Sequence, residues 1–141
     1  MHSYFFIAYC VLKLKEKGKK IIFLGENGSG KSTLFFLLNG ILKKDSGDIF
    51  LENKKIKYKK KDLDELRRKV GVVFQDPDIQ IFAPTVFQEI AYGLENIGFS
   101  INEIESKVEK ILKELELNDL KENPCHHLSY GQKKRVSIAS I

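Results

Sequence analysis

One stretch of nine residues constrains this chain more than any other. It reads Gly25-Glu26-Asn27-Gly28-Ser29-Gly30-Lys31-Ser32-Thr33 and matches the phosphate-binding pattern G-x-x-x-x-G-K-[ST] at every defined position. An apolar run that predicts a buried strand, Lys20 to Leu24, precedes it, and an apolar segment of helix length, Ser32 to Leu42, follows. Strand, loop and helix in this order are the context that the motif requires. The sequence therefore predicts a binding site for a nucleoside triphosphate.

Each defined position of this loop has a chemical reason. Glycines at 25, 28 and 30 let the backbone turn with its amides pointing inward, where a side chain would block a phosphate. The start of the following helix adds unpaired N–H groups and the positive end of a dipole. Lys31 is expected to place its charge on the β- and γ-phosphates, and the Ser32 hydroxyl to ligate Mg²⁺. The strand–helix context disfavours the alternative, a glycine-rich turn that binds nothing.

The amino-acid composition excludes few classes of protein. A chain of 141 residues with 43% hydrophobic and 30% charged residues is typical of one soluble globular domain. The formal charge of +5 and the basic run from Lys54 to Lys61 raise the possibility of nucleic acid. The run contains one aromatic residue, however, and so offers no stacking platform. A solvated hairpin or loop is the favoured interpretation, and no nucleic-acid partner is expected.

The cysteines and the N-terminus indicate a cytoplasmic protein. Cys10 and Cys125 lie far apart, which is no disulfide framework and fits a reducing compartment. The run Cys125-His126-His127 raises a metal site, but three adjacent residues rarely face one ion and the sequence has no second ligand cluster. The apolar segment Met1 to Leu12 is too short to span a bilayer and lacks the basic leader of a signal peptide.

The order of expected elements is that of an α/β chain. Strands are expected at about 4–14, 20–24, 48–51 and 70–74, and helices from residue 32 to about residues 39–40, at 62–69, after residue 84 and from residue 101. The pair Asn39-Gly40 is a left-handed-compatible helix stop. Ser100-Ile101-Asn102-Glu103 is a capping box. The helix that it opens has one apolar stripe predicted to face the core, formed by Ile101, Ile104, Val108, Ile111, Leu112 and Leu115.

Two later segments reduce the number of functions that are compatible with the phosphate loop. In Val72-Val73-Phe74-Gln75-Asp76-Pro77 a glutamine stands at the end of a predicted strand, and Leu128-Ser129-Tyr130-Gly131-Gln132-Lys133-Lys134-Arg135-Val136 follows the phosphate loop by roughly a hundred residues. Either one alone also fits a polar strand end or an ordinary helix cap. Together with the loop they resemble the ATP-binding-cassette (ABC) ATPases, whose diagnostic elements are a Q-loop and an LSGGQ signature. The resemblance covers nearly the whole chain.

The resemblance implies a fold and a domain organisation. The fold class is α/β, a P-loop NTPase of the ABC ATPase type with a partial RecA-like core plus a helical subdomain. Residues 1–75 would be the N-terminal part of the nucleotide-binding core, 76–127 the helical subdomain, and 128–141 the signature and the start of its helix. The segments Leu38 to Leu42 and Val73 to Val86 look like those of one subgroup, the ATPase subunits of cobalt/nickel and vitamin importers of the energy-coupling-factor kind.

The resemblance also implies cofactors and site residues. ATP and Mg²⁺ would bind at Gly25 to Thr33, including Glu26, Asn27 and Ser29. Lys31 and Gln75 would be the catalytic residues, with Ser32 and Gln75 as the metal ligands. Ser129, Gly131 and Gln132 would reach the γ-phosphate of the ATP held by a second subunit, because a hydroxyl and an amide at a helix start suit an anionic oxygen.

Two kinds of partner are implied. The first is a second ABC ATPase subunit, in a homo- or heterodimer. The second is a transmembrane coupling subunit at the cytoplasmic face of the membrane, docked on the segment from Asp76 to Leu94, where Ile79, Ile81, Phe82 and Phe87 offer apolar anchors. The alternative for these four residues is that they pack inside the helical subdomain. The transported substrate is left open.

Three features depart from the family pattern. Tyr130 stands at the first glycine of LSGGQ, and neither Tyr4 nor Tyr9 aligns convincingly with the aromatic residue that stacks on adenine. No apolar strand ending in Asp-Glu follows Arg135, so the chain is expected to be incomplete at the C-terminus. Two hypotheses stay open: part of an importer ATPase, or a truncated, inactive remnant that at most binds nucleotide. DNA-repair and chromosome-structure ATPases are disfavoured, because the spacing leaves no room for their long coiled coil.

Overall fold

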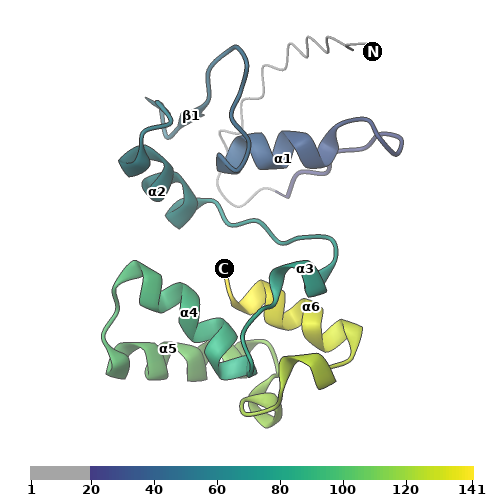
Figure 1. Ribbon diagram of the computed structural model, residues 1–141, viewed down its shortest axis with the longest axis vertical. Helices are drawn as coiled ribbons and strands as arrows, with labels where there is room; N and C mark the ends of the chain where they lie inside the picture. Colours follow the sequence, from purple (N-terminus) through teal and green to yellow (C-terminus); the bar gives the residue numbers. More distant parts are fainter. Residues whose placement is uncertain (1–19) are drawn as a thin grey trace. The chain divides into compact units, whose positions relative to one another are not determined.

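The computed structural model describes residues 20–141, drawn in colour in Figure 1. The expected strand at 4–14, together with Tyr4, Tyr9 and Cys10, lies outside the described residues. By its internal contacts the chain divides into two units, Met1–Lys31 and Ser32–Ile141. The two units are therefore described one at a time.

The described part of the first unit is irregular until its end. The predicted strand from Lys20 to Leu24 is wrong, because no strand forms there. Ile22 and Leu24 are 80% and 90% exposed. A strand is stable only when its backbone bonds to a neighbouring strand, and the one sheet within residues 20–141 is a short hairpin elsewhere. Apolar composition alone therefore does not make this segment a strand.

The second unit begins with helix α1, a hairpin and helix α2. Helix α1 (Lys31–Asn39) ends at Gly40, whose φ of +74° confirms the predicted left-handed stop. Strands β1 (Phe50–Leu51) and β2 (Lys54–Lys55) pair antiparallel, so the strand expected at 48–51 forms in its last two residues. Helix α2 (Lys60–Lys69) begins two residues before its predicted start.

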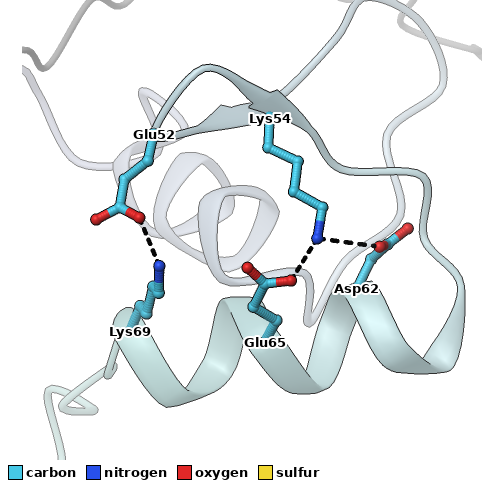
Figure 2. Close-up of polar contacts among 5 residues, drawn as sticks. All are labelled: Glu52, Lys54, Asp62, Glu65 and Lys69. Carbon is cyan, nitrogen blue, oxygen red and sulfur yellow. Dashed lines mark hydrogen bonds and ion pairs between the residues drawn. The ribbon is translucent and has the colours of Figure 1, made fainter.

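Ion pairs join the hairpin to α2 (Figure 2). The Lys54 ammonium bonds to Glu65 and lies 3.9 Å from the Asp62 carboxylate, and Lys69 Nζ lies 2.5 Å from Glu52 Oε2. The bond with Lys54 lowers the pKa of Glu65, and the same bond raises the pKa of Lys54. Exposed pairs of this kind each contribute little to stability. The basic run that begins at Lys54 thus starts in the predicted hairpin, and it ends in the first turn of α2, which the sequence did not predict there.

The core of the second unit is helical. Figure 1 shows α4 (Val86–Ile97) beside α5 (Ile101–Glu114), with α6 (Tyr130–Ala139) packed on α4. The short helix α3 (Pro77–Gln80) precedes α4, and two short 3-10 helices, η1 (Asn118–Leu120) and η2 (Cys125–His127), lie between α5 and α6. The most deeply buried apolar side chains come from all three long helices and their connections: Val86, Ile90, Val108, Leu112, Leu117 and Val136. Burial of these side chains is the main stabilising term for this unit.

The predicted capping box and apolar stripe of α5 are mostly confirmed. Ser100 and Glu103 form the reciprocal capping bonds. The stripe's central residues, Ile104, Val108 and Leu112, are buried, and its later members are half-buried. Ile101 is 82% exposed, so its place in the stripe is wrong. Side chains lean toward the N-terminus of a helix, and that of the first residue therefore projects past the helix end.

The predicted strand from Val70 to Phe74 is also wrong, because these residues form neither strand nor helix. Side chains hold the segment in place instead. Asn39 Nδ2 donates to the Val70 carbonyl, and the Phe74 amide donates to Gln80 Oε1 at 3.1 Å. The Phe74 ring packs on Phe36 with 5.7 Å between ring centroids. The apolar side chains find half-buried positions without a partner strand among the described residues.

The helical core predicts a sharp contrast along α5. Leu112→Ala should lower the free energy of unfolding by about 2–5 kcal/mol, because it leaves a cavity in the core. Ile101→Ala, at an exposed position of the same helix, should change it by no more than about 0.5 kcal/mol. Urea unfolding followed by circular dichroism measures both. Equal losses for the two variants would contradict this description of the core.

Candidate functional site

The glycine-rich loop wraps around its own lysine. Lys31 Nζ donates to the carbonyl oxygens of Gly25 at 2.8 Å and Glu26 at 2.7 Å, and lies 3.2 Å from Ser29 Oγ. The Ser29 amide donates to the Glu26 carbonyl at 3.2 Å and closes a turn. The lysine charge therefore lies inside the curve of the loop, and Lys31 is also the first residue of α1.

The loop needs its glycines for different reasons. Gly28 and Gly30 have φ of +81° and +85°, a left-handed conformation that costs other residues energy. A Cβ on Gly25 would lie 2.7 Å from Ser29 Oγ, so a side chain there would displace the serine. The positive φ at Gly28 and Gly30 confirms the expected backbone turn, whereas the expected blocking of a phosphate by a side chain stays a prediction.

Ser32 and Thr33 occupy the first turn of α1 in the second unit, and both are exposed. The amides of this first turn have no partner within the helix. Their donors and the helix dipole favour an anion at this end. The exposed hydroxyl of Ser32 is an oxygen ligand of the kind that Mg²⁺ prefers.

Gln75 is exposed and lies in a bend directly before α3. Its carbonyl oxygen accepts hydrogen bonds from Tyr130 Oη at 3.1 Å and from Lys134 Nζ at 3.0 Å. Lys134 Nζ also donates to the Phe74 carbonyl at 2.6 Å. The structure thus brings the Q-loop segment and the signature helix α6 together, which are about sixty residues apart in the chain.

Gln80 also attaches the Q-loop segment to α6, and the sequence analysis did not identify this residue. Its Oε1 accepts from the Phe74 amide, while its Nε2 donates to the Ser137 carbonyl at 2.6 Å and lies 3.2 Å from Ser140 Oγ. A single glutamine at the end of a four-residue helix carries no periodic signal that would have identified it. An ion pair between Lys133 Nζ and Asp78 Oδ1, at 2.6 Å, lies beside it.

The signature residues form the cap of α6. Ser129 Oγ accepts from the Gln132 amide at 3.3 Å, and Gln132 Oε1 accepts from the Ser129 amide at 2.8 Å. A Cβ on Gly131 would meet no atom within 4 Å. Ser129 and Gly131 are both exposed, so the helix start faces solvent, although the Ser129 oxygen already accepts from the Gln132 amide. The helix-cap alternative is correct as local structure, and it leaves the predicted phosphate contact untested.

A buried carboxylate shapes the surface after the Q-loop. Glu89 is 3% exposed, and its Oε2 accepts from the amides of Phe82 at 3.0 Å and Ala83 at 2.8 Å. Phe82, 65% exposed, packs edge-on against Tyr92 with 4.7 Å between ring centroids. An open groove of about 330 Å³ lies here, lined by Phe82, Ala83, Pro84, Phe87, Gln88, Ala91, Tyr92 and Glu95. The sequence analysis did not single out Glu89; an acidic residue among the apolar residues of α4 is the signal that could have identified it.

The four expected apolar anchors divide into two pairs. Ile79 and Phe82 are exposed, with 70% and 65% of their surface in contact with solvent. Ile81 and Phe87 are half-buried and pack against the helical core. The packing alternative is therefore correct for Ile81 and Phe87, whereas docking through Ile79 and Phe82 stays a prediction.

The cysteine–histidine run is built around a buried thiol. Cys125 is 4% exposed, and burial raises the pKa of its thiol to about 11. His126 and His127 are exposed and contact each other, with 4.2 Å between ring centroids. Within residues 20–141 no cluster of three or more His, Cys, Asp or Glu side chains is placed to hold a metal ion. In the same part of the chain, no helix has the length and apolar character needed to cross a membrane.

Comparison with known proteins gives consistent matches. An energy-coupling factor transporter ATP-binding protein, EcfA, from Methanocaldococcus jannaschii is 50% identical over 126 residues, which are 89% of this chain and 45% of that protein. A putative ABC transporter ATP-binding protein from Methanosarcina mazei is 52% identical over 126 residues, 89% of this chain and 28% of that protein. The chain therefore spans less than half the length of these relatives.

A solved structure matches in fold as well as in sequence. It is cbiO1 from Clostridium perfringens, described as part of the ABC transporter complex cbiONQ. The match has a TM-score of 0.74 and 49% sequence identity, and covers 83% of this chain and 47% of cbiO1. This likeness confirms the predicted fold class, a P-loop NTPase of the ABC ATPase type. The family model for the ABC transporter family matches residues 12–141, and the chain therefore belongs to that family.

Proposed function

We propose that this chain is the nucleotide-binding part of the ATPase subunit of an ABC importer of the energy-coupling-factor kind. The observation that carries the proposal is the Lys31 ammonium held inside the loop by Gly25 and Glu26. A cation enclosed by a glycine-rich backbone is the arrangement that receives the β- and γ-phosphates of ATP. The names of the relatives support the transport role, and a cobalt or nickel ion or a vitamin is the proposed cargo.

Binding of ATP would replace the contacts that the loop now makes with its lysine. Phosphate oxygens would take the donors of Lys31 that the carbonyls of Gly25 and Glu26 occupy. Charge-assisted hydrogen bonds to phosphate are stronger than bonds to neutral carbonyls, so the exchange favours the nucleotide. The remaining amides of the loop, from Glu26 to Thr33, would surround the phosphates.

The exposed oxygens of Ser32 and Gln75 suit Mg²⁺, which prefers hard oxygen ligands and keeps several waters. The ion would neutralise charge on the transferred phosphoryl group. In this proposal Ser32 holds the ion and Gln75 contacts the ion or orients the attacking water. Lys31 stabilises the negative charge on the phosphates.

A second ATPase subunit would complete the site. Ser129, Gly131 and Gln132 begin a helix whose first turn is exposed, and an exposed helix start binds an anionic oxygen well. We assign these three residues to the γ-phosphate of the ATP on the partner subunit. The subunits would act as a homo- or heterodimer.

The groove beside Phe82 is the proposed contact with a transmembrane coupling subunit, at the cytoplasmic face of the membrane. Glu89 fixes the backbone of Phe82 and Ala83, so the exposed aromatic ring is held in place. Fixed aromatic side chains in a partly apolar groove are typical anchors of protein interfaces. The description of cbiO1 as part of a transporter complex supports such a partner.

Lys31→Ala should lower the affinity for MgATP at least about 10-fold, because the β- and γ-phosphates lose a charged partner. Titration with a fluorescent ATP analogue measures this affinity. Lys43→Ala, which removes an exposed lysine outside the loop, is the matched control and should bind like the wild type. Equal binding by wild type and Lys31→Ala would sink the nucleotide assignment.

Phe82→Asp should weaken co-purification with the membrane subunit about 10-fold or more, because it places a charge in the lining of the groove. Thermal stability should change little, since the side chain is 65% exposed. Ile97→Asp, at an exposed apolar position outside the groove, should leave co-purification intact. A Phe82→Asp protein that is stable and still co-purifies at the wild-type level would contradict the docking site.

The alternative, a remnant that binds nucleotide without hydrolysing it, generates its own prediction. The proposed catalytic residues, Lys31 and Gln75, include no carboxylate that could activate water. A polypeptide of residues 1–141 should therefore release phosphate about 10²–10⁴-fold more slowly than a version extended by an apolar strand that ends in Asp-Glu. Phosphate release from both purified proteins tests this, and equal turnover would show that the extension is dispensable.

A further inference from the structure

Tyr130 stands where the signature of the resembled family has a glycine, and the structure gives its hydroxyl a partner. Tyr130 Oη donates to the Gln75 carbonyl at 3.1 Å. Lys134, one turn later on α6, donates to the same carbonyl at 3.0 Å and to the Phe74 carbonyl at 2.6 Å. Residues four apart lie on the same face of a helix, so two side chains of α6 hold one short piece of backbone.

The backbone at Gln75 depends on these side chains. Residues 71–74 have no regular structure, and residues 75–76 form a bend before α3. No helix or strand ladder therefore fixes the Gln75 peptide. The neighbouring contacts of Gln80 with Ser137 and of Lys133 with Asp78 anchor the α3 side of the segment. The carbonyls of Phe74 and Gln75 are left to Tyr130 and Lys134.

We propose that Tyr130 is a positioning residue for Gln75, and that Tyr130 and Lys134 together form a clasp between the Q-loop and the signature helix. This inference rests on the proposed role of Gln75 toward Mg²⁺. The clasp holds the Gln75 backbone, and it leaves the oxygen of the side-chain amide free to contact Mg²⁺. Ser129 directly precedes Tyr130, so the same bond couples the position of Gln75 to that of the signature serine.

Among glycine, phenylalanine and tyrosine at position 130, only tyrosine can donate to the Gln75 carbonyl. A glycine at position 130 has no side chain, so it cannot span the distance to the Gln75 carbonyl. A phenylalanine would keep the ring but lose the donor. The ring of Tyr130 is 62% exposed, which means that removing its hydroxyl changes little of the packed core. Tyr130→Phe is therefore a clean test of the hydrogen bond.

The experiment compares wild type, Tyr130→Phe and Gln75→Ala in the full 141-residue chain. Two quantities are measured: amide hydrogen exchange over residues 74–81, and ATP affinity with Mg²⁺ and with EDTA. The control is Tyr58→Phe, which removes a buried hydroxyl that has no hydrogen-bond partner in the described structure. Loss of one hydrogen bond corresponds to a change of about 2- to 12-fold in an equilibrium constant. Lys134→Met tests the second half of the clasp.

The clasp predicts faster exchange over 74–81 in Tyr130→Phe, by about 3- to 10-fold, with an unchanged melting temperature. It also predicts that the gain in affinity from Mg²⁺ falls by a similar factor, while affinity in EDTA stays the same. The double variant with Gln75→Ala should lose no more of the Mg²⁺ gain than Gln75→Ala alone, because both changes act on one group. A purely structural tyrosine would not change the Mg²⁺ gain selectively.

Three results would count against it, in different ways. Wild-type exchange in Tyr130→Phe would overturn the clasp. Faster exchange with an unchanged Mg²⁺ gain, while Gln75→Ala lowers that gain, would overturn the positioning role alone. An unchanged Mg²⁺ gain in Gln75→Ala would overturn the proposed role of Gln75, and with it the positioning of Gln75 for the ion. The exchange measurement would still decide whether the clasp exists.

Discussion

The attachment of residues 74–80 to helix α6 is the constraint on which the functional part of this structure depends. Gln80 bonds to the backbone at both ends of the attachment, to the Phe74 amide and to the Ser137 carbonyl. Lys134 holds the carbonyls of Phe74 and Gln75 from the other side. Residues 74–76 have no regular structure, so these side-chain bonds determine where the Q-loop lies relative to the signature.

This attachment connects local geometry to packing. Helix α6 is fixed because Val136 is fully buried in the core that α4 and α5 also share. The cap of α6, formed by Ser129 and Gln132, is therefore held by the same core. Glu89 belongs to α4, a helix of the same core, and it orders the backbone at Phe82 by accepting from the Phe82 amide. The signature, the Q-loop and the groove are three surfaces of one helical unit.

The sequence predicted best those features that are determined locally. The stop at Gly40, the capping box at Ser100 and the cap at Ser129 each depend on residues within one turn, and each is confirmed. The family and fold were predicted because the loop and the signature are local motifs with a characteristic spacing. The loop glycines at 28 and 30 likewise adopt the conformation that their motif requires.

The features that depend on distant partners were missed or wrong. The segments at 20–24 and 70–74 have the composition of strands, but a strand needs a neighbour, and within residues 20–141 no strand pairs with either segment. The contacts of Gln80 and Tyr130 span more than fifty residues, and no spacing in the sequence encodes them. The roles of Lys31, Gln75 and the signature toward nucleotide stay predictions, as do the domain boundaries at 75 and 127.

The central claim is that the loop from Gly25 to Thr33 binds the phosphates of MgATP. Amide resonances of a ¹⁵N-labelled chain, followed during titration with MgATP, test it most directly, because the loop amides would receive the phosphate oxygens. We expect the largest shifts at Gly28, Gly30 and Lys31, saturating together with one dissociation constant. Saturable binding that leaves these three resonances in place, with its shifts elsewhere, would contradict the claim.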